Sequence, residues 1–298
     1  MPTSLPSSPT GAAAAAGAAE VAWIHRRSAG GDIYFLANAR NRPVDVTVAL
    51  RAQGKSVQLF DPLDGSAREL PEKSITKDGR TALPLHFEPD QAVFVVVRQT
   101  SQKSADRRHS GEKNFTTIKT VIEIGGAWQV SFDASWVKPL PPAVAPGSKE
   151  VAVTFDKLDD WSKRTEEGIR GYSGVATYRK SFSLSPGVTP DRLIFIAIGE
   201  VKEMARVELN GGDLGVVWCP PWRVTVPAGL LKVSGNELVI TVANTWNNRM
   251  CLDAALPANQ RLTHVGHNLQ GQAAAQGLQP AGLLGPVTLQ VAEPVQAK

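Results

Sequence analysis

Residues 205–217, Ala-Arg-Val-Glu-Leu-Asn-Gly-Gly-Asp-Leu-Gly-Val-Val, alternate apolar and polar side chains on both sides of Asn210-Gly211-Gly212. Alternation with a period of two residues indicates half-buried β-strands. Asn and Gly tolerate the positive φ angles that a tight hairpin turn needs. The stretch therefore predicts two antiparallel strands, Ala205–Asn210 and Leu214–Val217, joined by a short turn.

The same alternation extends through the second half of the chain. It predicts further strands at Trp128–Phe132, Val151–Phe155, Ala176–Leu184, Leu193–Ile198, Arg223–Val226, Glu237–Ala243 and Val287–Val291. No segment of ordinary helical length has a convincing apolar stripe with helical spacing. Residues 115–294 are therefore expected to form an all-β domain, and their number suits a jelly roll.

A second series of short strands lies upstream of this domain. The predicted strands are Asp32–Asn38, Val44–Leu50, Val57–Leu59, Leu83–Phe87 and Gln91–Val97, with turn sequences at Asp61–Gly65 and Lys77–Gly79. Short strands separated by frequent turns are typical of a β-sandwich. We therefore predict a small sandwich over residues 21–98. Residues 99–114 are polar and have a linker composition, and residues 1–20 form a Pro/Ser/Ala-rich segment expected to be disordered.

Composition and charge exclude several classes of function. Of the 298 residues, 42% are hydrophobic and 20% charged, which is ordinary for a soluble globular protein. The formal net charge of +4 is spread along the chain, which argues against nucleic-acid binding. No apolar run reaches the length of about 18 residues that a membrane span needs. Cys219 and Cys251 could form a disulfide, but their spacing gives no signal for one, and we expect two free thiols. Without a Cys/His cluster we expect no metal and no cofactor.

Several motifs give the sequence a specific resemblance. They are Trp23-Ile-His-Arg-Arg27, Asp32-Ile-Tyr-Phe35, the segment Asp160–Phe182, the hairpin Val207–Gly215, Trp218-Cys-Pro-Pro-Trp-Arg-Val224, Gly235–Arg249 and Gly282–Val287. Their combination resembles the C-terminal region of bacterial α-L-rhamnosidases of glycoside hydrolase family 106. The later motifs resemble the galactose-binding-like jelly roll that binds sugar in β-galactosidase-type enzymes. The likeness covers about residues 21–292. It departs from the family at Met250–Asp253 and between His264 and Gln279.

The resemblance implies that the catalytic groups lie outside this sequence. Glycoside hydrolysis ordinarily uses two carboxylic groups on opposite sides of the scissile bond. In the similar enzymes this pair lies on an upstream (β/α) barrel, a fold that needs about 250 residues. Glu166 and Glu167 are neighbours in the chain and should point apart. We therefore expect no catalytic residue here and no activity of the chain by itself.

Sugar contact by the second domain is a separate expectation. Aromatic rings can stack on a sugar, and planar polar groups can bind its hydroxyls. The candidate substrate-binding residues are Trp161, Arg164, Glu166, Glu167, Tyr172, Trp246, Asn248 and Arg249. We expect Trp161, Tyr172 and Trp246 to be partly exposed and close together on a face that docks on the barrel. Trp218 and Trp222 are assigned to core or interdomain packing.

These observations predict a non-catalytic, β-sandwich part of a rhamnosidase-like glycoside hydrolase that supports or lines the active site of a barrel. Its expected partners are carbohydrate, including rhamnose-containing glycans, and a separately encoded barrel. One alternative is an independent carbohydrate-binding module, and a second is a glycosidase that acts on O-glycosyl bonds with an unfamiliar site. The family usually works in the periplasm or outside the cell, although residues 1–20 do not have the pattern of an export signal.

Overall fold

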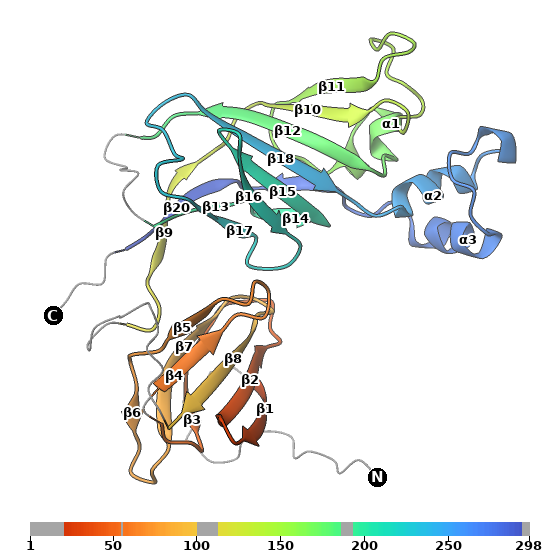
Figure 1. Ribbon diagram of the computed structural model, residues 1–298. Helices are drawn as coiled ribbons and strands as arrows, with labels where there is room; N and C mark the ends of the chain where they lie inside the picture. Colours follow the sequence, from red (N-terminus) through yellow and green to blue (C-terminus); the bar gives the residue numbers. More distant parts are fainter. Residues whose placement is uncertain (1–20, 55, 100–112, 186–192, 294–298) are drawn as a thin grey trace. The chain divides into compact units, whose positions relative to one another are not determined.

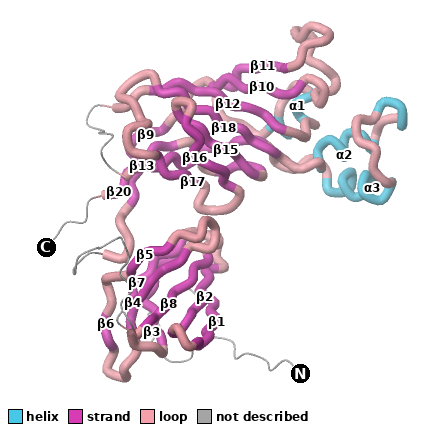
Figure 2. Tube along the Cα trace, in the orientation of Figure 1, coloured by secondary structure: helices cyan, strands magenta, loops and turns pink. Residues whose placement is uncertain are grey.

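The computed structural model describes residues 21–54, 56–99, 113–185 and 193–293. The described residues form two compact units that meet in sequence between Thr117 and Ile118, and Glu293 returns to the first unit. Strands are the main element of both units, as Figure 2 shows. The predicted all-β class is confirmed.

The first unit is a small sandwich of two antiparallel sheets (Figure 1). One sheet has the strand order β1-β2-β8-β4-β5 and the other β3-β7-β6. The strands are β1 (Val21–Ser28), β2 (Gly31–Asn38), β3 (Val44–Leu50), β4 (Ser56–Phe60), β5 (Ala67–Glu69), β6 (Ser74–Ile75), β7 (Thr81–Phe87) and β8 (Ala92–Arg98). Val57, Leu83, Phe87 and Val95 are fully buried in the core of this unit, and each belongs to a strand that the sequence predicts.

The join between the units differs from the expected boundary at residue 115. Asn114 is buried, and its side-chain amide donates to the carbonyl oxygens of Glu72 at 2.7 Å and Pro84 at 3.0 Å. The guanidinium of Arg68 lies 4.6 Å from the ring centre of Phe115. The chain therefore packs on the first unit as far as Thr117. Most of the expected linker, residues 100–112, and the Pro/Ser/Ala-rich segment, residues 1–20, lie outside the described residues.

The second unit is a larger sandwich. Its six-stranded sheet has the order β11-β10-β12-β18-β15-β16, its four-stranded sheet the order β17-β13-β20-β9, and β14 pairs with β19. The strands are β9 (Ile118–Glu123), β10 (Trp128–Asp133), β11 (Glu150–Phe155), β12 (Val175–Phe182), β13 (Ile194–Ala197), β14 (Glu200–Lys202), β15 (Met204–Leu209), β16 (Gly212–Val217), β17 (Arg223–Val226), β18 (Asn236–Ala243), β19 (Gly282–Gly285) and β20 (Thr288–Ala292).

The hairpin predicted within residues 205–217 forms. Strands β15 and β16 pair with Leu209 opposite Gly212. Asn210 and Gly211 take φ angles of 51° and 81°, which Asn and Gly adopt more readily than other residues. The side-chain amide of Asn210 also donates to the carbonyl oxygen of Leu230 at 2.7 Å, so the turn is attached to a neighbouring loop.

Short helices interrupt the second unit, and the sequence analysis did not predict them. They are η1 (Trp161–Lys163), α1 (Glu167–Arg170), α2 (Asn247–Ala254), η2 (Ala258–Gln260) and α3 (His267–Gln276). Helix α2 has no apolar stripe because its buried residues are Asn248, Arg249 and Asp253. Helix α3 has the Gln/Ala/Gly-rich composition that departs from the family pattern. Both helices follow β18, and Figures 1 and 2 show them side by side.

Candidate functional site

The eight candidate residues come from two segments that meet at one end of the second unit. Trp161 to Tyr172 lie between β11 and β12, whereas Trp246 to Arg249 lie just after β18. The backbone N–H of Arg249 donates to the hydroxyl of Ser173 at 3.0 Å, and the side-chain amide of Asn244 donates to the carbonyl oxygen of Tyr172 at 2.9 Å. We call this region the loop end and define it as residues 133–142, 159–174 and 244–281.

Trp161 and Tyr172 are buried at the loop end, so the expectation that they are partly exposed is wrong. Each has 0% relative exposure. The indole N–H of Trp161 donates to the hydroxyl of Tyr178 at 2.5 Å. The hydroxyl of Tyr172 donates to the carbonyl oxygen of Val175 at 2.8 Å, and burial raises its pKa. Because both polar groups have internal partners, these rings serve as core despite their polar sequence neighbours.

Arg164 and Glu166 form a local pair. The guanidinium of Arg164 donates to both carboxylate oxygens of Glu166, at 2.5 and 3.1 Å. The same guanidinium lies 4.2 Å from the ring centre of Phe155. The hydrogen bond from Arg164 is the largest influence on Glu166 and lowers the pKa of its carboxyl group. Both side chains are partly exposed, and their main contacts are with each other and with the sandwich.

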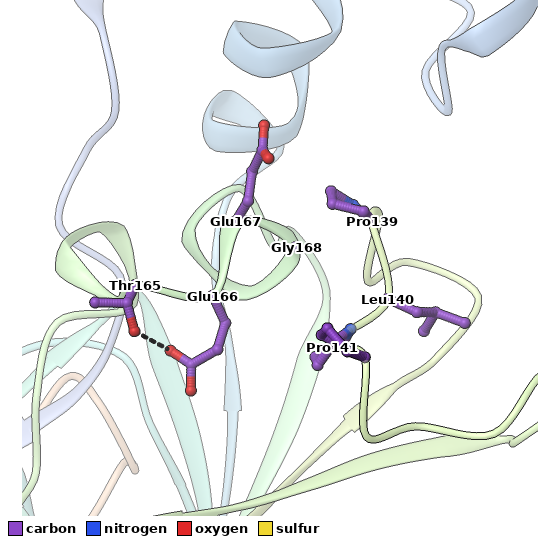
Figure 3. Close-up of a pocket in the computed structure, with 8 residues that line it drawn as sticks. Pro139, Leu140, Pro141, Thr165, Glu166, Glu167 and Gly168 are labelled. Carbon is purple, nitrogen blue, oxygen red and sulfur yellow. Dashed lines mark hydrogen bonds between the residues drawn. The ribbon is translucent and has the colours of Figure 1, made fainter.

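Glu167 has a different environment although it is the next residue. It is exposed at the start of α1, and its side chain has no hydrogen-bond or ion-pair partner among the described residues. Figure 3 shows the two carboxylates pointing to opposite sides of the chain. Two groups arranged in this way cannot flank one glycosidic bond, as a catalytic pair must.

Asn248 and Arg249 are buried, which corrects the expectation that they face a ligand. Arg249 pairs with the carboxylate of Asp253 at 2.8 Å and donates to the carbonyl oxygen of Lys138 at 3.1 Å. The second carboxylate oxygen of Asp253 accepts from the backbone of Thr263 at 2.7 Å. The side chain of Asn248 bonds the backbone of Gln279 in both directions, at 2.7 and 2.8 Å. These buried hydrogen bonds hold the segments of the loop end together.

Trp246 is the one aromatic candidate that the structure leaves open to solvent. Its side chain is 53% exposed, and its ring meets that of Trp136 edge-on, with centroids 5.2 Å apart. Trp136 was not singled out by the sequence analysis, although it lies just before a Pro-rich loop. Trp218 is 60% exposed and so does not belong to the core, whereas its assignment to interdomain packing stays a prediction. Trp222 is partly buried and packs against the core.

A cleft of about 280 Å³ lies between two loops of the loop end. One wall consists of Pro139, Leu140, Pro141 and Pro142, and the other of Thr165 to Gly168. Figure 3 shows the prolines facing the segment that holds Glu166 and Glu167. The cleft therefore combines an apolar wall with a wall built by Thr165, Glu166, Glu167 and Gly168, among which Glu167 has an unpaired carboxylate.

Among the described residues, no three His, Cys, Asp or Glu side chains gather as metal ligands would. The described helices include none that is both long and apolar enough to cross a membrane. Cys219 and Cys251 do not form a disulfide.

The fold and its loop end belong to an all-β protein, and comparisons with known proteins relate it to glycoside hydrolases. A family model described as α-L-rhamnosidase, glycoside hydrolase family 106, matches residues 8–73. A rhamnosidase structure from Novosphingobium sp. PP1Y is 29% identical, with a TM-score of 0.72, over 93% of this chain and 24% of that one. A Formosa agariphila protein named "Putative beta-glucuronidase" is 34% identical over 152 residues, which make up 50% of this chain and 12% of that protein.

The chain is therefore a glycoside hydrolase-related protein that is like the α-L-rhamnosidases of family 106. It spans about a quarter of the length of the similar rhamnosidase.

Proposed function

We propose that these residues form the non-catalytic β-sandwich region of an α-L-rhamnosidase-like glycoside hydrolase. The region supports or lines the active site of a catalytic barrel that lies outside the 298 residues, on the same polypeptide or on a separate one. It also contacts the carbohydrate substrate. The main observation in support is that the likeness extends over 93% of this chain but only 24% of the similar rhamnosidase.

The carboxylates of the loop end support the same proposal. The carboxylate of Asp253 is engaged by Arg249 and by the backbone around Thr263. Asp160 is buried and accepts from the backbone N–H groups of Ser162 and Ala281, each at 3.0 Å. Burial raises the pKa of Asp160, but these hydrogen bonds outweigh burial and lower it overall. A general acid needs a raised pKa, so this carboxylate suits a structural role.

The proposal is tested by incubating the purified chain with a chromogenic aryl α-L-rhamnoside. We expect no turnover above that of a blank purified in the same way. The matched variant replaces both acidic residues, Glu166→Gln with Glu167→Gln. Turnover that follows the protein through chromatography and is absent from this variant would contradict the proposal and favour a glycosidase with an unfamiliar site.

An independent carbohydrate-binding module is the second candidate function. The observations in its favour are the exposed ring of Trp246 and a cleft that includes Glu167, both of which belong to the loop end. This function requires that the isolated chain bind sugar with useful affinity when no barrel is present. Isothermal titration of the chain with rhamnose-containing oligosaccharides measures that affinity directly. The two candidate functions thus differ in whether the sandwich alone suffices for binding.

A further inference from the structure

We propose that Trp246 and the cleft beside α1 form a subsite for one pyranose ring of a glycan. In this subsite the ring of Trp246 stacks on the apolar face of the sugar, and the carboxylate of Glu167 accepts hydrogen bonds from its hydroxyls. The inference rests on the carbohydrate role proposed above and assigns that role to two residues. It excludes Trp161, Tyr172, Asn248 and Arg249 as direct contacts, because all four are buried.

Trp246 is exposed but keeps one aromatic contact. It immediately precedes α2, and its ring packs edge-on against Trp136, which is itself partly buried against the core. Its indole N–H has no partner among the described residues. A large ring that is half exposed and packs on a neighbouring ring along one edge has a free face for stacking on a ligand, and the packed edge reduces the side-chain entropy that binding must cost.

Lys138 links the segment that holds Trp246 to the segment that holds Glu167. Its carbonyl oxygen accepts from the buried guanidinium of Arg249, three residues after Trp246. On the other side, a Cβ added to Gly168 would lie 3.1 Å from the nitrogen of Lys138 and 2.1 Å from the carbonyl oxygen of Pro139. Only glycine permits this approach. It brings the start of α1, and with it Glu167, against the loop that Arg249 fixes to α2.

The cleft has the size and chemistry for a single sugar. Its volume of about 280 Å³ lies at the lower end of the range for ligand pockets, which favours one ring over an oligosaccharide. Glu166 already accepts two hydrogen bonds from Arg164 and has little capacity left. Glu167 has both carboxylate oxygens available, and a carboxylate can accept from two neighbouring hydroxyls at once.

This combination fits a pyranoside better than other ligand classes. A pyranose ring has C–H groups on one face and hydroxyls around its edge, which match an aromatic surface and a carboxylate acceptor. An anionic ligand would be repelled by Glu167. A protein partner would need a larger apolar area than one indole ring to bind stably. We therefore propose a pyranoside as the ligand, and the experiment below would detect a protein partner at Trp246 instead.

The test is a titration of the ¹⁵N-labelled full chain with methyl pyranosides, including methyl α-L-rhamnopyranoside, followed by NMR and tryptophan fluorescence. We expect saturable millimolar binding to at least one pyranoside, with shifts at the Trp246 indole N–H and the amides of residues 165–168. Trp246→Ala and Glu167→Gln should each weaken binding by about tenfold, equivalent to about 1.4 kcal/mol. Trp218→Ala is the matched control, because Trp218 is equally open to solvent, and it should not change the affinity.

Each other outcome overturns a defined part of the proposal. Absence of saturable binding, or equal losses in the Trp246 and Trp218 variants, overturns the subsite. A loss confined to Trp246→Ala overturns the role of Glu167. A third outcome is that the chain tumbles slowly, that Trp246→Ala abolishes the slow tumbling, and that sugar causes no shifts. This result would identify Trp246 as part of a protein-docking surface and would also overturn the subsite. None of these results depends on hydrolysis, so failure here differs from the turnover that would contradict the proposed non-catalytic role.

Discussion

Two groups of aromatic side chains, at the loop end and on the adjoining strand β12, have opposite environments although both groups include loop residues. The first group consists of Trp161, Tyr172 and Tyr178, all with 0% exposure, and their rings contact one another. The second is the pair Trp136 and Trp246, of which Trp246 is 53% exposed. Both groups include residues from polar or glycine-rich loops. Loop sequence alone therefore did not determine which rings are buried.

The difference lies in what surrounds each ring. The buried indole N–H has a hydroxyl partner in Tyr178, so its burial leaves no polar group unsatisfied. Glycine provides the space: Gly282 takes a φ of +100°, and a Cβ there would lie 2.4 Å from the Trp161 indole nitrogen. Trp246 has neither a polar partner nor such a glycine among the described residues. Specific partners and backbone space decide which aromatic rings are buried here.

The largest expected effect is that of Trp161→Ala. The substitution leaves a cavity in the core of the second unit and removes one of the two N–H groups that donate to the Tyr178 hydroxyl. We expect a loss of about 4–5 kcal/mol in the free energy of unfolding. Urea denaturation followed by circular dichroism measures this loss. A loss below about 1 kcal/mol would mean that the two aromatic groups do not differ as described.

Arg249→Ala should have the next largest effect. The change leaves the buried carboxylate of Asp253 without its cation and releases the carbonyl oxygen of Lys138. Breaking a buried ion pair from one side costs about 3 kcal/mol. The indole N–H of Trp246 should also sharpen and shift in NMR spectra, because its support becomes mobile.

The control for Arg249 is Arg206→Ala. Arg206 pairs with Asp213 at 2.8 Å, but this pair is on the surface. Exposed pairs add little to stability, so no measurable change is expected. If both arginine variants lost the same stability, burial of the Arg249 pair would not be the cause.

Asp160 is expected to make a smaller, pH-dependent contribution to the free energy of unfolding. Its pKa is lower in the folded chain than the usual value of 3.8. The ionised form therefore stabilises the fold above the unfolded pKa, and this contribution is lost as the pH falls through the folded pKa. Asp160→Asn should cost about 2 kcal/mol at neutral pH and should flatten the loss of stability below about pH 4. Denaturant midpoints measured from pH 7 to pH 2 give both quantities. An unchanged acid limb would contradict this role.

The sheets could be predicted from the sequence because their physical cause is local. Val44, Val46 and Val48 alternate with polar residues, and Asn210-Gly211 supplies the backbone freedom of the hairpin. Helix α2 could not be predicted in this way. Its buried residues are Asn248, Arg249 and Asp253, whose partners are distant in sequence, such as Lys138 and Gln279. A hydrophobic period cannot reveal a helix that packs through polar contacts.

The candidate residues show the same limit. The sequence analysis placed all eight in the second domain, and the structure brings their two segments together at one end of it. It could not separate Glu166 from Glu167, because the difference lies in which carboxylate Arg164 reaches. It could not find Trp136, whose contact with Trp246 joins residues 110 positions apart. The binding role of these residues stays a prediction.

The smallest expected effect is that of Trp246→Ser, which tests the exposed aromatic pair as Trp161→Ala tests the buried group. More than half of this side chain already contacts water, so its removal returns little apolar surface to solvent. The edge-on contact with Trp136 is the main packing interaction lost. We expect a change of at most about 0.5–1 kcal/mol in the free energy of unfolding. The measurement is the same urea denaturation used for Trp161→Ala, performed side by side. A loss near that of Trp161→Ala would place Trp246 in the core, and an exposed stacking surface at this corner could then no longer be assigned to it.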